Sequence, residues 1–144
     1  MDLFFDTSAL VKIFSAEQGS EKIRELVFNP ENKIFLLDLC VVELMSTVFR
    51  KWRNHEIPDV DLDRVISAIE KQIGYFEVIP LHDRLVSEAK ILVKDFGKSI
   101  GLRTLDAIHI AGWLGLKNLN CMFCTSDRNQ FAVVQQLRAS CQFF

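Results

Sequence analysis

The chain has 144 residues, of which 25% are charged and 49% hydrophobic, and its formal net charge is −2 at pH 7. This composition and length are those of a globular protein, so we expect one domain over 1–144. The small net charge excludes a protein that coats nucleic acid nonspecifically, because such proteins have a large basic excess.

The predicted elements alternate between strands and helices. Short apolar runs predict strands, and apolar residues spaced three and four apart predict helices. Strands that alternate with helices form parallel βαβ units, so we expect an α/β fold with a parallel sheet of about four or five strands, covered by helices on both faces. In chain order we expect a strand at 1–5, helices at 9–14 and 20–28, a strand at 33–37, helices at 39–53 and 60–73, a strand at 75–79, helices at 84–96 and 104–116, a strand at 121–125, a helix at 129–137 and a strand at 141–144.

The apolar segments predict a cytoplasmic location. Asp2 precedes the first apolar run and no Lys or Arg does, which is not typical of a signal peptide. The longest apolar stretch, IFLLDLCVVELM, is interrupted by Asp38 and Glu43, so we expect no membrane span.

Cys121 and Cys124 form a C-x-x-C spacing within a predicted strand. Residues three apart on a strand face opposite sides of the sheet, which is poor geometry for a shared metal ion. We therefore expect the cysteines to be buried thiols of the core.

Two predicted strands end in a carboxylate. Asp6 follows the strand at 1–5, and Asp127 follows the strand at 121–125 with Thr125 and Ser126 before it. Ligands of parallel sheets bind outside the carboxyl ends of the strands, so both acids are candidates for a site. Asp is also a common N-cap of the helix that follows such a loop, and this alternative stays open for each.

Two further acids lie on predicted helices. Glu43 is followed at i+3, i+4 and i+7 by Ser46, Thr47 and Arg50, a polar stripe on an otherwise apolar helix. Asp106 lies near the start of the helix at 104–116, where small residues at 107, 111 and 115 would let the helix lie close to the sheet. Acids favoured by the helix dipole are the alternative interpretation of both.

Convergence of these four acids would require a cation, because neighbouring carboxylates repel and one would otherwise take up a proton. A set of hard oxygen ligands without His or Cys at useful spacing favours Mg²⁺ or Mn²⁺ over zinc. The expected substrate of such a site is a phosphodiester. If each acid is instead paired with a Lys or Arg side chain, no metal site is expected.

Four stretches resemble the PIN-domain ribonucleases, particularly the VapC-type toxins: FFDTSAL, VVELMSTVFR, LRTLDAIHIAGWL and FCTSDRNQF. The resemblance implies an α/β/α sandwich and a Mg²⁺- or Mn²⁺-dependent endoribonuclease acting on single-stranded RNA, the toxin of a type II toxin–antitoxin pair. The fourth motif has TSD where related chains often have TAD or TND, which leaves Asp127 in place. The resemblance assigns catalysis and metal binding to Asp6, Glu43, Asp106 and Asp127, and the support of these acids to Thr7, Thr125 and Ser126.

Partners are also implied by the resemblance. Lys12, Arg103 and Arg128 lie within a turn or two of the acids, so each could contact RNA phosphates or pair with an acid. His109, one turn after Asp106, is expected to have a packing or supporting role. Toxins of this kind usually form a homodimer and bind a small antitoxin whose apolar helix lies in a groove beside the site.

Two other classes of protein are alternatives. A noncatalytic PIN-like module that binds RNA or protein would have a broken acid set, whereas all four acids are present. A phosphotransfer domain also has an Asp at a strand end, but the phosphatase pattern requires a second Asp at position 8, which is Ser, and receivers require a late Lys where this chain has Thr125 and Ser126.

Overall fold

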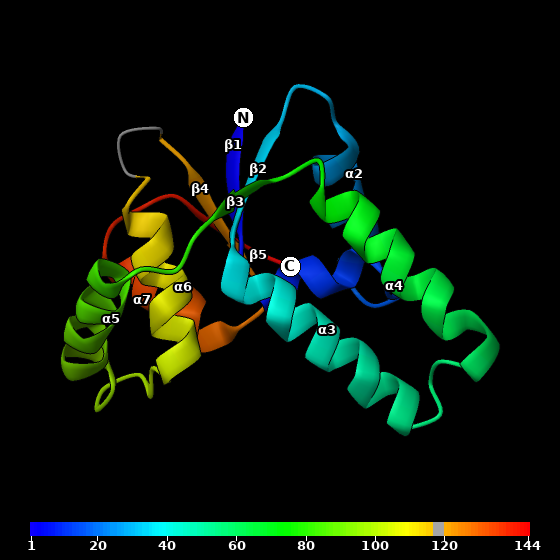
Figure 1. Cartoon of the computed structure of the whole chain (residues 1–144). Helices are drawn as coiled ribbons and strands as arrows, with labels where there is room; N and C mark the ends of the chain where they lie inside the picture. Colours follow the sequence, from blue (N-terminus) through cyan, green and yellow to red (C-terminus); the bar gives the residue numbers. More distant parts are fainter. Residues whose placement is uncertain (117–119) are drawn as a thin grey trace.

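The computed structural model describes residues 1–116 and 120–144, and these form an α/β fold around one parallel sheet. The strand order is β3-β2-β1-β4-β5, and every neighbouring pair is parallel (Figure 1). This agrees with the predicted sheet. The strands are β1 (Asp2–Phe5), β2 (Lys33–Leu37), β3 (Glu77–Ile79), β4 (Met122–Thr125) and β5 (Cys141–Phe143).

Helices cover both faces of the sheet. Among the described residues, one face packs against the first four α-helices and the other against the last three, so the sheet is the middle of three layers (Figure 1). The helical elements are α1 (Thr7–Leu10), the 3₁₀ helix η1 (Val11–Ile13), α2 (Ser20–Phe28), α3 (Asp38–Arg53), α4 (Asp59–Ile73), α5 (Asp83–Phe96), α6 (Thr104–Leu114) and α7 (Arg128–Gln136).

Alternation along the strands divides the core in two. In β1, Leu3 and Phe5 face α1 to α4, whereas Phe4 faces α5 to α7 and stacks on Phe123 of β4 with ring centroids 5.7 Å apart. All of these side chains are fully buried. Because both faces are covered, the central strands β1, β2 and β4 are apolar over most of their length, as is usual for parallel sheets.

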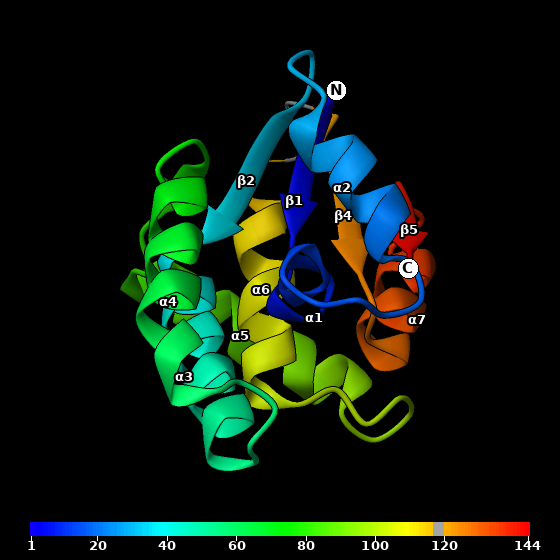
Figure 2. The same cartoon turned by 90° about the vertical axis from the view of Figure 1, so that its right-hand side faces the viewer.

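The order of the strands reverses direction at β1. Chain connections lead from β1 to β2 on one side and later return to β4 on its other side (Figure 2). Crevices for ligands form outside the carboxyl ends of strands at such a switch point. Asp6 and Asp127 follow β1 and β4, so the topology brings both acids to this crevice.

Two local expectations are corrected. The predicted helix at 9–14 is a short α-helix, α1, followed by η1. Gly115 was expected to let α6 approach the sheet, but it is the exposed C-cap of that helix. Gly112 has that role instead, since a Cβ placed on it would lie 2.7 Å from Cδ2 of Leu37.

The cysteines are free thiols, and Cys121 and Cys124 are buried. Burial raises the pKa of Cys121 to about 12, so this thiol stays protonated at neutral pH. The expectation of buried core thiols is confirmed for Cys40, Cys121 and Cys124, whereas Cys141 is only half-buried. None of the helices in residues 1–116 and 120–144 is both long and apolar enough to cross a lipid bilayer.

Candidate functional site

One cavity of about 430 Å³ lies at the switch point, and all four predicted acids line it. Asp6 follows β1, Glu43 lies on α3, Asp106 lies in the first turn of α6, and Asp127 precedes α7. Four separate elements thus bring together residues that are up to 121 positions apart. The other lining residues are Thr7, Ser8, Val11, Ser46, Thr47, Arg50, Arg103, Leu105, His109 and Gln130.

Asp6 is the most deeply buried of these acids, with 1% of its surface exposed. Its Oδ1 accepts a hydrogen bond from the Ala9 amide and so caps α1, as one alternative predicted. Ser8 Oγ lies 2.9 and 2.8 Å from the two carboxylate oxygens. Burial raises the pKa of Asp6, and it outweighs the opposite effects of the nearby His109 charge and the Ala9 amide.

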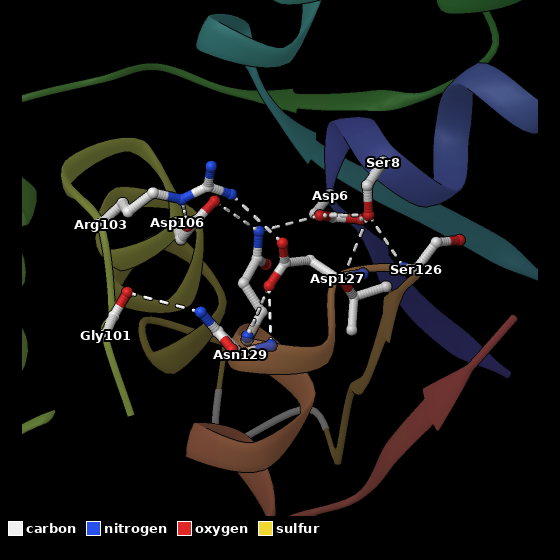
Figure 3. Close-up of polar contacts among 10 residues, drawn as sticks. Asp6, Ser8, Gly101, Arg103, Asp106, Ser126, Asp127 and Asn129 are labelled. Carbon is white, nitrogen blue, oxygen red and sulfur yellow. Dashed lines mark hydrogen bonds and ion pairs between the residues drawn. The ribbon is translucent and has the colours of Figure 1, made fainter. Parts of the chain in front are cut away.

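Asp106 and Asp127 share one guanidinium group (Figure 3). Arg103 Nε donates to Asp106 Oδ2 at 2.9 Å, and Arg103 Nη2 donates to Asp127 Oδ2 at 3.2 Å. The other oxygen of Asp127, Oδ1, caps α7 by accepting from the amides of Asn129 and Gln130. Asp127 is therefore both an N-cap and a wall of the cavity, so the two interpretations of this acid are compatible.

Gln130 joins Asp6 to Asp106. Its Nε2 donates to Asp6 Oδ2 at 2.9 Å and to Asp106 Oδ1 at 3.1 Å, while the side chain is almost fully buried. One neutral amide thus satisfies two carboxylates that would otherwise repel each other. Its own Oε1 is buried and has no hydrogen-bond partner among the described residues.

Glu43 pairs with the buried His109. His109 Nε2 lies 2.7 Å from Glu43 Oε2, and the Thr7 hydroxyl donates to the same oxygen. Burial acts to raise the pKa of Glu43, but the hydrogen bonds from His109 and Thr7 outweigh it and hold that pKa below its usual value. The structure agrees with a supporting role for His109 and with contact between Thr7 and the acids.

Of the two hydroxyl residues near β4 that were expected to support the acids, Thr125 does contact them and the Ser126 hydroxyl does not. Thr125 Oγ1 accepts from the Asp127 amide at 2.9 Å and lies 3.3 Å from Ser8 Oγ. The Ser126 amide donates to Ser8 Oγ, whereas the Ser126 hydroxyl has no hydrogen-bond partner among residues 1–116 and 120–144. Ser8, which the sequence analysis did not assign, is therefore the hydroxyl that contacts both oxygens of Asp6.

The three basic residues proposed for RNA differ in position. Arg103 lines the cavity and pairs with two acids. Lys12 Nζ donates to the backbone carbonyls of Gln18 and Phe144, and neither Lys12 nor the exposed Arg128 lines the cavity. Arg50, the last residue of the polar stripe predicted after Glu43, does line it.

The donor set fits a hard dication in its chemistry, since it consists of carboxylates at the end of a parallel sheet. As the side chains lie, no three His, Cys, Asp or Glu residues within 1–116 and 120–144 are grouped closely enough to hold a metal ion. Arg103 and Gln130 bind the carboxylate oxygens instead. Asp6 and Glu43 have no Lys or Arg partner in the described part of the chain, so the acids are not all neutralised by basic side chains.

Gln130 could not have been recognised from its spacing. Asp127 and Gln130 match the capping-box pattern, in which the Gln side chain returns to the backbone of the N-cap. Here the Asp127 amide donates to Thr125, which leaves Gln130 free to reach Asp6 and Asp106. The contact of Ser8 with Asp6 was also not predicted, although the separation of two residues is short enough to suggest a local side-chain hydrogen bond.

The model of the PIN domain family matches residues 3–135 of this chain. A comparison with curated protein sequences found no match. Similar solved structures include FitAcB from Neisseria gonorrhoeae, with a TM-score of 0.69 and 13% identity over 99% of this chain and 96% of that chain. VapBC-1 from nontypeable Haemophilus influenzae has a TM-score of 0.65 and 15% identity over 99% of this chain and 98% of that chain. A toxin–antitoxin complex from Klebsiella pneumoniae has a TM-score of 0.58 and 18% identity over 91% of each chain.

At sequence identities of 13–18%, the similarity to these solved structures shows a shared fold and no more. The family match rests on the sequence and spans most of the chain, including the four acids. The protein is therefore a member of the PIN-domain family.

Proposed function

We propose that this chain is an endoribonuclease that hydrolyses phosphodiester bonds of single-stranded RNA with Mg²⁺ or Mn²⁺, and that it acts in the cytoplasm as the toxin of a type II toxin–antitoxin pair. Members of the PIN-domain family are nucleases. The observation that carries the proposal is the convergence of Asp6, Glu43, Asp106 and Asp127, from four elements, on one cavity.

Each group around the cavity has a task in this proposal. Asp6, Asp106 and Asp127 would hold the cation, which when bound supplies Lewis acidity and neutralises charge on the phosphate. Gln130 keeps Asp6 and Asp106 at a short separation through its shared amide. Glu43, oriented by His109, adds a fourth carboxylate to the same wall.

Arg50 supports RNA as the substrate. It lines the cavity together with Ser46 and Thr47, all on the face of α3 that begins at Glu43. Seven residues of helix rise by about 10 Å, so this stripe leads away from the acids along the cavity wall. A guanidinium and two hydroxyl groups there suit the phosphates that flank a cleaved bond.

Cleavage is tested by incubating the purified chain with total RNA, with and without Mn²⁺, and mapping new ends. We expect cuts that require the metal, and Asp6→Asn or Asp106→Asn to lower the rate at least about 100-fold, because each loses a carboxylate for the cation. Asp83→Asn is the matched control, since Asp83 also lies in the first turn of a helix but is exposed and outside the cavity. Undiminished cleavage by both site variants would contradict the assignment.

A noncatalytic module that binds RNA or protein is the second candidate. The contacts of Arg103 with Asp106 and Asp127 favour it, because they satisfy acids that a cation would need. Binding of RNA without new ends at any Mn²⁺ concentration would support this candidate and exclude the nuclease.

Partners follow from the same proposal. The similar structures from Klebsiella pneumoniae and Haemophilus influenzae are a toxin–antitoxin complex and VapBC-1. Exposed apolar side chains at Val42 and Phe49 of α3 and Val60 of α4 would suit an apolar antitoxin helix. A short upstream reading frame whose product co-purifies with this chain would support an antitoxin, and sedimentation of the isolated chain would test the proposed homodimer.

A further inference from the structure

Arg103 holds the two carboxylate oxygens that remain available on Asp106 and Asp127. On Asp106, Oδ1 accepts from Gln130 and Oδ2 accepts from Arg103. On Asp127, Oδ1 caps α7 and Oδ2 accepts from Arg103. A cation could bind Asp106 and Asp127 through Oδ2 of each residue and leave the cap of α7 and the Gln130 bridge intact. Both of these oxygens, however, already accept hydrogen bonds from Arg103.

The guanidinium can leave these oxygens without disturbing the fold. Arg103 is the N-cap residue of α6, and its backbone carbonyl accepts from the Ala107 amide at 2.9 Å, which holds the main chain in place. Its side chain is 72% exposed, whereas those of Asp106 and Asp127 are 12% and 23% exposed. Ion pairs formed by such an exposed side chain are weak, so a dication would displace it at modest cost.

We propose that Arg103 competes with the cation for Asp106 and Asp127 and, when displaced, binds a phosphate of the RNA. This rests on the proposed metal-dependent nuclease. Arg103 lines the cavity, so a displaced guanidinium stays beside the substrate. A guanidinium can bind a phosphate through two charge-assisted hydrogen bonds. Arg103 is then a substrate-binding residue of the loaded enzyme and a counter-ion of the metal-free one.

The proposal predicts effects of opposite sign for Arg103→Ala. Calorimetric titration of the metal-free protein with Mn²⁺ should give a Kd about 3- to 10-fold lower than that of the wild type, because the competing ion pairs are gone. Cleavage at saturating Mn²⁺ should show a KM for RNA about 10-fold higher, because a phosphate contact is lost. The KM of Arg103→Lys should lie between those of the wild type and Arg103→Ala, because the lysine keeps the charge but not the bidentate geometry.

Arg128→Ala is the matched control. It removes the same charge next to Asp127, but Arg128 is exposed and makes no ion pair with the described residues. Its Mn²⁺ affinity should rise much less than that of Arg103→Ala. Equal increases in the two variants would reduce the effect to net charge and overturn the proposal.

The calorimetry separates this proposal from the proposed function. If the wild type binds Mn²⁺ and Arg103→Ala binds it with unchanged or lower affinity, the competition is wrong while the metal site stands. If neither the wild type nor Arg103→Ala binds Mn²⁺, the metal site itself is wrong and the competition falls with it. Tighter Mn²⁺ binding by Arg103→Ala with an unchanged KM would overturn the phosphate contact alone.

Discussion

Individual side chains in this protein often serve two groups at once. Asp6 and Asp127 each use one oxygen to cap a helix and present the other to the cavity, and Gln130 divides one amide between Asp6 and Asp106. Such sharing is possible because a carboxylate has two oxygens and a primary amide has two hydrogens. It also means that one substitution disturbs several contacts.

Gln130→Met tests the bridge between the acids. The substitution keeps the length of the side chain but removes both hydrogen bonds, so buried carboxylates lose a partner. We expect the free energy of unfolding at neutral pH to fall by about 1.5–3 kcal/mol. Gln135→Met, an exposed change on the same helix, should alter it by less than about 0.5 kcal/mol in the same urea titration. Equal stability of the two variants would show that the bridge contributes nothing.

Asp6 and Glu43 should have opposite effects on the pH dependence of stability. The folded-state pKa of Asp6 is raised. The contribution of Asp6 to the free energy of unfolding is therefore present at low pH and is lost as the pH rises through that pKa. The folded-state pKa of Glu43 is lowered, so its contribution is present at neutral pH and is lost as the pH falls through that pKa.

Unfolding of metal-free protein across acidic pH measures this difference. Asp6→Asn should gain stability relative to the wild type as the pH rises toward neutrality, whereas Glu43→Gln should lose it. Both variants should approach a constant offset from the wild type at the acidic end, where the carboxyl groups are protonated in every form. Parallel curves for all three proteins would contradict the role of the two acids.

At the level of elements, the site depends on how closely α6 lies to the sheet. Gly112 leaves no room for a side chain against Leu37, and α6 also bears Asp106 and His109. The depth of one helix therefore sets the positions of two cavity residues.

Gly112→Val should force α6 away from β2. Overpacking of a filled core costs about 1–3 kcal/mol, which exceeds the small gain in helix propensity. We expect a lower free energy of unfolding in urea and weaker Mn²⁺ binding, because Asp106 moves with the helix. Gly115→Ala, at the exposed end of the same helix, should change both quantities little. If Gly112→Val had the wild-type free energy of unfolding and the wild-type Mn²⁺ affinity, Leu37 would have to move aside without displacing the helix.

At the level of the whole molecule, a cation held by acids from several elements would link the layers of the fold. A ligand that binds only the folded state stabilises it by about 2.7 kcal/mol at 100 times its Kd, which corresponds to roughly 5–10 °C in a chain of this size. Residues that follow β1 and β4 and one that begins α6 would then be joined through one ion.

Thermal unfolding with Mn²⁺ and with a chelator measures this linkage. We expect the melting temperature of the wild type and of Asp83→Asn to rise with Mn²⁺, and that of Asp106→Asn to rise far less. A shift of equal size in all three proteins would indicate nonspecific binding of the ion rather than a site at the switch point.

The sequence alone determined the order of elements and the acids that could meet. Periodicity and strand-end position are local properties, so helices such as Ser20–Phe28 and strands such as Lys33–Leu37 were predicted with their observed bounds. The sheet and its two helical layers followed from the alternation of these elements. The four acids were predicted as a set, and the fold places all of them around one cavity.

Only the tertiary structure decided which atoms meet. Gln130 reaches Asp6, 124 positions away, because β1 and β4 are neighbours in the sheet, and its spacing from Asp127 pointed to a helix cap instead. Lys12 binds backbone carbonyls away from the cavity, whereas Arg103 spans Asp106 and Asp127. Hydrogen bonds form only within a few tenths of an ångström of their preferred length, and the placement of distant segments at that scale has no signature in local sequence.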